Sequence, residues 1–327
     1  MRYALEASLL AISLFFSQII NSAELNNNYV QTWAGVEVMG VNLEAAQNIR
    51  KQMPFKKGSN YNKSELSKYL LTCRNIVKEK IGYDAQCSTI SYGNGNVYLS
   101  VDILPSKNNS LYRKIPQKEG EVAKLPKKLQ NLYDVLNDRF EFLITTGNFP
   151  IEKIGQNYKD FEDPKLHATA KKLSRCVPRY NDILLDIIQY SQDDDEREKA
   201  AELFSWSRNI NNLFLILNWD ILLDPDEGVR NNIARSFAPI LPDIKDKALL
   251  TNLISVYCKQ ASFSSHLDRN KALLSILKIL EKNKELTSDI NDECQGTIRY
   301  INEMSILENS GGFAKKIITI VDNSKNA

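Results

Sequence analysis

The sequence predicts a small α+β domain followed by a larger all-α domain of paired antiparallel helices. Three observations support this fold class. Residues 32–104 alternate between β-branched and amphipathic helical segments, a helical period takes over after Pro126, and one acid–arginine spacing recurs after 33 residues. We therefore expect domains over 30–104 and 126–327, joined by a linker over 105–125 that is rich in Lys, Asn and Ser.

The charge balance argues against a nucleic-acid partner. Lys and Arg number 42 and Asp and Glu number 40, so the formal net charge is +2. Binding to a phosphate backbone relies on a concentrated positive field, which this composition does not provide. The 43% of hydrophobic and 25% of charged residues are ordinary for a globular protein.

Residues 1–23 have the features of a signal peptide. An apolar run over 9–20 has the length of a signal core and is short for a membrane span, and we expect cleavage after Ala23. Glu6 and Asn21 depart from the usual pattern, so an uncleaved membrane anchor is the alternative. The sequence thus predicts an exported protein, periplasmic or secreted, with no membrane span after cleavage.

The first domain is expected to run strand, helix, helix, strand, strand. A β-branched strand ends near Gly40, and one helix starts after Asn42, a good N-cap residue. A second helix starts after Asn62, and residues 85–104 read as a hairpin that turns at 93–95.

This order, with the segment VEVMGVNLEAAQNIRKQMPFKKGSNYN, resembles a POTRA domain, a small periplasmic module of outer-membrane assembly and secretion proteins. The resemblance covers about seventy residues. It implies that the sheet edge takes up an extended peptide by strand addition. No β-barrel pattern follows, so an assembly role is not implied, and a domain that serves only as a spacer is the alternative.

After Pro178 the helices are expected in pairs, and an acid–arginine corner recurs between them. The expected pairs are 181–191 with 193–207, 212–223 with 224–241, and 247–258 with 267–280. Asp193 and Arg197 recur as Asp226 and Arg230, with the acid four residues before the arginine each time. Arg269 follows in a third, lengthened or degraded unit, in which Asp268 stands beside it.

Acids at the start of a helix cap free amides and offset the positive helix end, so we interpret these residues as structural corners. The segment DPDEGVRNNIAR resembles the turn of bacterial HEAT-repeat proteins, over roughly residues 162–280. The resemblance implies an α-solenoid that binds proteins and carries no catalytic residues. Exported bacterial chains with a POTRA-like module ahead of HEAT repeats look similar overall. Helices over 288–307 and 313–321 are expected to cap the array.

The alternative interpretation of the acidic turns and the histidines is a metal or catalytic site. A calcium loop that starts at Asp224 would place Gly228 fifth and Arg235 twelfth, where ligands are needed. His167 and His266 stand 99 residues apart without a zinc motif, and a Cys176–His167 pair lacks an orienting group. We expect no catalytic residue, cofactor or metal, and neither histidine beside an acid or thiol in a concave pocket.

The cysteines are consistent with an oxidising compartment. Cys73 and Cys87 lie close in sequence within one domain and are the expected disulfide. Cys258 and Cys294 are candidates for a second one between neighbouring helices, with Cys176 left over. The alternative is that all five are buried thiols.

The functional expectation is a non-catalytic, exported protein–protein interaction scaffold. It would bind partners through the solenoid surface and by strand addition at the POTRA-like sheet edge. The alternative is an envelope enzyme or inhibitor that acts in a groove between the two modules.

Overall fold

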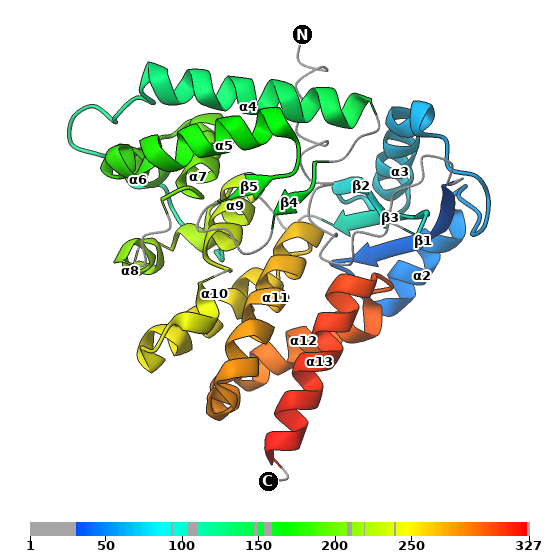
Figure 1. Cartoon of the computed structure of the whole chain (residues 1–327). Coiled ribbons are helices and arrows are strands. Elements are labelled where there is room, and N and C mark those ends of the chain that lie inside the picture. The colour runs from blue at the N-terminus through cyan, green and yellow to red at the C-terminus, as the bar shows by residue number, and fades with distance from the viewer. Residues whose placement is uncertain are drawn as a thin grey trace. The chain divides into compact units, whose positions relative to one another are not determined.

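The computed structural model is mostly helical, with a small sheet formed by the N-terminal part of the chain (Figure 1). It describes residues 31–92, 94–103, 110–146, 150–153, 159–207, 211–218, 220–238 and 240–325. The predicted signal peptide over 1–23 lies outside the described residues. Within them, no helix is both long enough and apolar enough to cross a membrane.

The chain divides into two compact units, neither of which is continuous in sequence. The sheet unit holds the chain up to residue 107, Ala261–Leu273 and Lys284 to the C-terminus. The helical unit holds Asn108–Gln260 and Leu274–Asn283. This division differs from the sequence-based boundary, because the C-terminal helices group with the sheet and not with the helical array.

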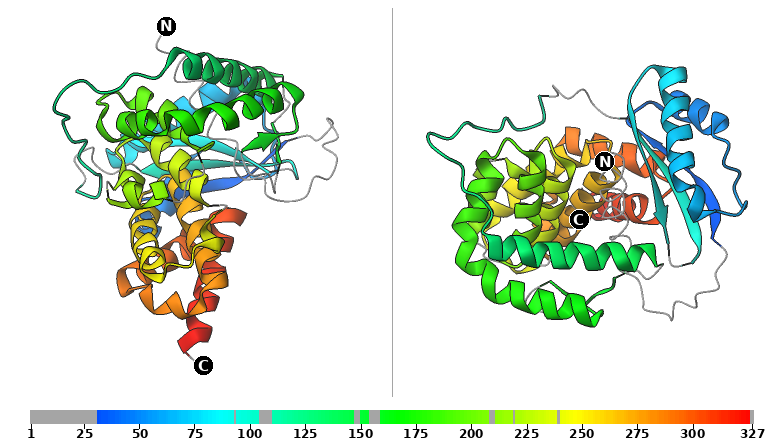
Figure 2. Two further views of the ribbon diagram at one scale, coloured as in Figure 1. Left: turned by 60° about the vertical axis from the view of Figure 1, so that its left-hand side comes forward. Right: turned by 90° about the horizontal axis from the view of Figure 1, so that it is seen from above.

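The sheet unit contains the predicted order of elements in its N-terminal part: strand β1, helices α2 and α3, and strands β2 and β3. Their bounds are β1 Thr32–Met39, α2 Leu43–Gln52, α3 Leu66–Ile81, β2 Ala85–Ser91 and β3 Asn96–Ile103, with a 3₁₀ turn η2 at Lys63–Glu65. The sheet order is β1–β3–β2, in which β1 is parallel and β2 antiparallel to β3 (Figure 2). The central strand is therefore the last one in the sequence.

Local signals explain where the two helices begin and end. The Asn42 side chain accepts a hydrogen bond from the Ala45 N–H at 2.9 Å, which caps α2. Helix α3 ends at Gly82, whose φ of 73° lies in the left-handed region that favours glycine. The apolar face of α3 packs on the sheet through Cys73 and Val77, both fully buried.

The C-terminal part of the sheet unit is helical. It consists of η6 Lys284–Asp289, α12 Asp292–Met304 and α13 Glu308–Lys325. Helices α12 and α13 pack on each other, and α12 contacts β1. Leu307 joins Ile90 and Tyr92 of the hairpin in a buried apolar cluster. These helices thus complete the core of the sheet unit.

The helical unit contains helices near most of the expected positions, but the helix expected over 212–223 ends at Asn218, and Ile221–Leu223 form a separate 3₁₀ turn. Its helices are α4 Lys127–Thr145, α5 Pro164–Cys176, α6 Asn181–Tyr190, α7 Asp194–Phe204, α8 Asn211–Asn218, α9 Glu227–Phe237, α10 Lys247–Ala261 and α11 His266–Lys282. The division assigns Ala261 of α10 and residues 266–273 of α11 to the sheet unit. Short elements are the strands β4 Glu152–Lys153 and β5 Asp160–Phe161 and the 3₁₀ turns η3 Val177–Tyr180, η4 Ile221–Leu223 and η5 Leu241–Asp243. Helix α4 lies beside α5, and α7 packs on both α6 and α9 (Figure 2).

The described part of the predicted linker, residues 110–125, is fixed to the helical unit although it forms no helix or strand. The Lys118 ammonium donates to the Asp186 carboxylate at 2.6 Å, and the Ala123 N–H donates to the same carboxylate at 2.8 Å. Arg113 is buried against Asp224. These partners are far apart in sequence, and local composition does not reveal such contacts. This is why the composition of the segment predicted a linker.

Candidate functional site

The acids of the first two repeat corners cap helices. Asp193 Oδ1 accepts from the Glu196 N–H at 3.2 Å at the start of α7, and Asp226 Oδ1 accepts from the Val229 N–H at 2.8 Å at the start of α9. Each carboxylate therefore satisfies an amide that has no partner inside its own helix.

Ser265 occupies the equivalent place at the third corner. Its Oγ accepts from the Leu267 N–H at 3.2 Å and from the Asp268 N–H at 3.4 Å. It precedes Arg269 by four residues, the same spacing as in the two earlier corners. The third unit therefore keeps the corner with serine in place of the acid, and Asp268 is not its counterpart. Serine is an ordinary N-cap residue, so this spacing was open to detection from the sequence.

The arginine of each corner is the fourth residue of its helix and is buried. Arg197 donates to both Asp224 carboxylate oxygens, at 3.0 and 3.2 Å. Arg230 donates to two carbonyl oxygens of the turn ahead of it, at Asp224 (2.5 Å) and Pro225 (3.0 Å). The first two corners are thus joined through one turn.

Asp224 is the centre of this polar cluster and is fully buried. Besides Arg197, its carboxylate accepts from Arg113 at 2.5 and 2.9 Å and from the Asp226 N–H at 2.9 Å. Two guanidinium groups therefore occupy the oxygens that a calcium ion would need. The acidic turn fits a structural corner and does not fit a metal site.

Arg269 has different partners, which lie on the sheet. Its Nη2 donates to Glu37 Oε1 of β1 at 2.6 Å, and its Nη1 donates to Asp102 Oδ1 of β3 at 3.0 Å. All three side chains are at most 3% exposed. Burial alone would lower the pKa of Arg269, but the two carboxylates raise it above its usual value.

The two acids also hold backbone from the C-terminal half of the chain. Glu37 Oε2 accepts from Ser305 Oγ at 2.6 Å and from the Ile306 N–H at 3.0 Å, between α12 and α13. Asp102 Oδ2 accepts from the His266 N–H at 3.0 Å at the start of α11. This cluster connects three stretches of chain, and the sequence analysis assigned no role to either acid.

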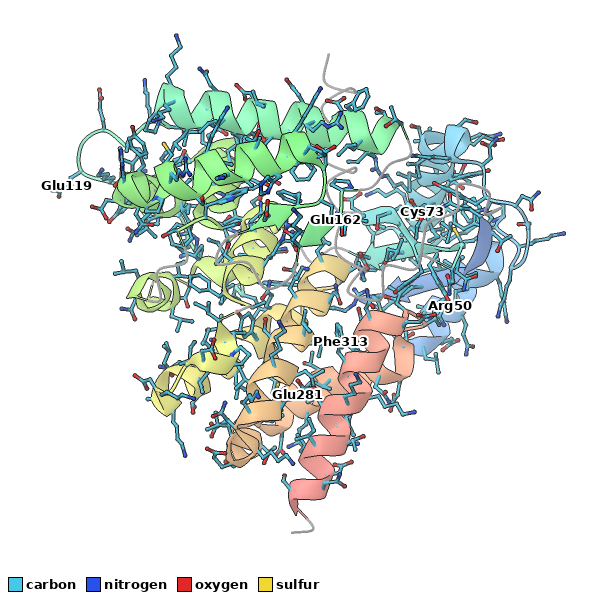
Figure 3. All side chains as sticks on the ribbon, viewed as in Figure 1. Arg50, Cys73, Glu119, Glu162, Glu281 and Phe313 are labelled. Carbon is cyan, nitrogen blue, oxygen red and sulfur yellow. A yellow bond between two sulfur atoms is a disulfide. The ribbon has the colours of Figure 1, made fainter. Side chains whose placement is uncertain are left out.

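The cysteine pairing is confirmed. Cys73 of α3 and Cys87 of β2 form a disulfide (Figure 3). Cys258 and Cys294 are also disulfide-bonded, and Cys176 is a buried free thiol. The Cys73–Cys87 bond fastens a helix to an edge strand of the sheet.

The outer side of β1 is occupied within the sheet unit. The Trp33 N–H donates to the Ser59 carbonyl at 2.9 Å, and the Gly58 N–H donates to the Trp33 carbonyl at 2.7 Å. Arg50 Nε donates to the Val36 carbonyl at 3.1 Å. Both backbone groups of Trp33 and the Val36 carbonyl are therefore already paired on this edge.

The other edge of the sheet is β2. The Tyr92 N–H donates to the Asn96 carbonyl at 2.9 Å, which makes these two residues a hydrogen-bonded pair of the hairpin. Such pairs alternate along an antiparallel ladder, so the N–H groups of Ala85, Cys87 and Thr89 point away from β3. Within the described residues of the sheet unit, no strand pairs with that side of β2.

One histidine lies beside an acid, whereas the sequence analysis excluded such a pair within a concave pocket. His167 Nδ1 of α5 is 2.7 Å from Asp160 Oδ1 of β5, and Asp160 is buried while the His167 side chain is 40% exposed. Lys153 Nζ is 3.9 Å from the same carboxylate. Cys176 stands nine residues further along α5, about 13 Å at 1.5 Å per residue, so His167 and Cys176 do not form a pair. The other histidine, His266, is buried, and desolvation followed by the charges of Arg269 and Lys271 lowers its pKa to about 3.

Comparison with known proteins does not identify a family or a function for the chain. No protein-family model, curated protein or solved structure matches the chain. The resemblance to POTRA domains and HEAT repeats therefore rests on the sequence segments that carry it.

Proposed function

We propose that the protein is a non-catalytic, exported scaffold that binds partner proteins, and that it takes up an extended partner segment along the outer side of β2. The observation that carries this proposal is the contrast between the two sheet edges. Trp33 and Val36 on β1 are already hydrogen-bonded on their outer side, whereas the outward amides of β2 face no strand of their own unit. A strand added there would pair with Ala85, Cys87 and Thr89.

The composition of β2 also supports β2 as the edge to which a partner strand is added. Natural proteins usually protect an edge strand with charged residues or proline. Residues 85–91, AQCSTIS, contain neither. The disulfide from Cys87 to α3 fixes the strand in place, so little ordering of β2 is required on binding. Cys87 and Thr89 are buried in the free protein, so whatever covers this edge has to move aside when a strand is added.

The helical unit offers a second surface, in keeping with the HEAT-type solenoid that we propose for it. Val135 and Phe142 of α4 are 54% and 52% exposed. They are seven residues apart and so share one face of the helix. We propose this helix face as a contact surface of the helical unit.

Export is the proposed setting, because it accounts for the disulfides. Bonds such as Cys73–Cys87 form and persist in oxidising compartments and are rare in a reducing cytosol. The proposed export is thus supported by a disulfide among the described residues as well as by the signal-like segment over 1–23.

The test uses the protein without its signal segment as bait in its own envelope fraction, followed by purification of the partner that it captures. Hydrogen exchange measured by NMR should then show slower exchange at Ala85, Cys87 and Thr89 in the complex, and unchanged exchange at Gln86 and Ser88. That alternation is specific to strand addition, because inward amides are already bonded to β3. Equal protection at all five positions, or protection elsewhere alone, would exclude this binding mode.

A matched pair of variants adds an affinity test. Ala85→Pro removes one outward N–H at the first residue of β2, where proline is tolerated, while Ala85→Val keeps the N–H. Loss of one hydrogen bond should weaken capture about fivefold in the proline variant only. Equal affinity of the two variants would count against the edge.

The His167–Asp160 pair favours a second candidate, an enzyme that uses His167 as a general base. Asp160 is placed to hold the imidazole in one orientation, and the partial exposure of His167 gives access to its other nitrogen. Screening of the purified protein against ester, amide and phosphoester substrates tests this candidate. Turnover that disappears in His167→Gln would establish it, and turnover retained in that variant would exclude it.

A further inference from the structure

Helix α5 of the helical unit has an exposed face on which every charge is positive. The exposed residues of this helix are four cations, Lys165, Lys171, Lys172 and Arg175, together with Pro164 and Ala168. At about 100° per residue, the four cations fall within an arc of about 120°, so they share one side of the helix. No aspartate or glutamate occurs over residues 164–180. We call these four cations the basic face of α5.

The basic face has no acidic partner among the described residues. None of its four cations forms an ion pair there. The acids that come just before them in the sequence have other partners, since Asp163 pairs with Arg139 of α4 at 2.5 Å and Asp160 lies 2.7 Å from His167. Asp182, which follows the helix, is exposed and forms no ion pair in the described part of the chain.

The neighbouring helix α4 carries exposed acids, but they lie on its other side (Figure 2). Arg139 marks the side of α4 that is turned toward α5, because it reaches Asp163. The exposed acids Asp134, Asp138 and Glu141 lie about 100° to 160° around α4 from Arg139. They are therefore turned away from α5 and do not neutralise its basic face.

Helix stability does not account for this arrangement. Lys165 lies in the first turn of α5, where the positive end of the helix disfavours a cation, whereas α7 and α9 begin with acids. Lys171 and Arg175 are four residues apart, a spacing at which like charges repel each other. Only Arg175, in the last turn, is favoured by its place in the helix. An anion bound along this face would offset the repulsion.

The form of the face favours an acidic polypeptide segment as that anion. Lys165 and Arg175 are about 15 Å apart along the helix, a length that about five residues of extended chain cover. The apolar residues Leu166 and Leu173 of α5 are fully buried, so none of them is left to enter a lipid bilayer beside the cations. The face also has no aromatic side chain on which a nucleic-acid base would stack.

We propose, on the basis of the scaffold function above, that the basic face of α5 binds an extended acidic segment of a partner protein. Carboxylates of about five successive residues lie along the helix and pair with Lys165, Lys171, Lys172 and Arg175. This surface is separate from the outer edge of β2, so either kind of binding can be lost without the other.

The test measures binding of fluorescein-labelled hexaglutamate to the full chain without its signal segment, by fluorescence anisotropy at low salt, with hexaglutamine as the neutral probe. The blocking variant is Lys171→Glu with Lys172→Glu. The matched control is Lys315→Glu with Lys316→Glu, which reverses two neighbouring exposed lysines of α13 and changes the net charge equally. Lys171→Arg with Lys172→Arg keeps the charge, and Lys172→Gln with Arg175→Gln replaces the blocking variant if circular dichroism shows that the latter is unfolded.

We expect hexaglutamate to bind and hexaglutamine not to bind. The blocking variant should weaken hexaglutamate binding at least about tenfold, and added salt should weaken it in the wild type. The α13 control, the arginine variant and Ala85→Pro should each retain the wild-type affinity within about twofold.

Absence of hexaglutamate binding, or an equal loss in the α13 control, would overturn the proposal. Tighter binding of phosphatidylglycerol vesicles or of oligothymidylate, lost in the blocking variant, would also overturn it, in favour of a lipid surface or a nucleic acid. Capture of a partner through β2 without any binding of hexaglutamate would refute the role of the basic face and leave the proposed scaffold function in place.

Discussion

The buried Arg269 cluster makes a quantitative prediction about stability. In Arg269→Met, a side chain of similar length replaces the guanidinium, and Glu37 and Asp102 lose the cation that faces both of them at 2.6 and 3.0 Å. Removing one partner of a buried ion pair costs about 3 to 5 kcal/mol, because a charge is left uncompensated away from water. We expect a loss of this size in the free energy of unfolding near neutral pH.

Urea unfolding measured at several pH values is the assay, and the direction of the pH dependence follows from the charges. Deprotonated carboxylates are unfavourable in the folded variant, so its folded state binds more protons than its unfolded state. The stability of Arg269→Met therefore falls relative to wild type as pH rises, and the loss should be smaller near about pH 4.5 than near about pH 8.

Two further variants separate charge from packing. Arg299→Met removes an exposed arginine, whose pair with Asp322 is 50% and 47% exposed, and should cost less than about 1 kcal/mol. Adding Glu37→Gln and Asp102→Asn to Arg269→Met removes the two buried carboxylate charges and should recover part of the loss. A loss below about 1 kcal/mol in Arg269→Met, or one that does not vary with pH, would refute this account of the cluster.

Three other predictions concern single groups. Burial, followed by the charge of Asp226, raises the pKa of Glu198 to about 8, so wild-type stability declines as pH rises from the usual glutamate range toward 8. Glu198→Gln should therefore stabilise the protein by about 1 to 2 kcal/mol near pH 8 and by little near pH 4, as read from urea midpoints. Replacing both Cys73 and Cys87, which are 14 residues apart, with serine removes this disulfide alone and should cost roughly 3 kcal/mol in the same assay, and an unchanged midpoint would contradict the entropic argument. Asp193→Ala removes the α7 cap and should cost about 1 kcal/mol in thermal unfolding, whereas Asp193→Ser should cost much less.

Local patterns carried the prediction of the elements. The β2–β3 hairpin, the N-cap at Asn42 and the apolar periods of the helices from α6 to α11 depend on residues within a few positions of each other. They are found near the predicted positions, except that the helix expected over 212–223 ends at Asn218. The Cys73–Cys87 bond was within reach for the same reason, since α3 and β2 are adjacent in the chain.

The long-range contacts between these elements could not be predicted from local patterns. Glu37 looked like a polar residue within a strand, and Asp102 lies on the polar side of an alternating pattern, which is typical of a sheet face that meets solvent. Their partner Arg269 is 232 and 167 residues away. The pairing of Arg113 with Asp224 spans 111 residues in the same way and turned an apparent linker into part of the helical unit.

The sheet unit is assembled from both ends of the chain, and this affects the order in which the protein matures. A polypeptide that leaves a ribosome or a translocation channel from its N-terminal end delivers Glu37 and Asp102 long before Arg269 and the Ser305 turn. Residues 108–260 emerge in between and make up nearly all of the helical unit. The helices of residues 108–260 are thus able to fold before the sheet unit is complete. Until then, Glu37 and Asp102 on the early strands lack the partners that Arg269 and Ser305 provide.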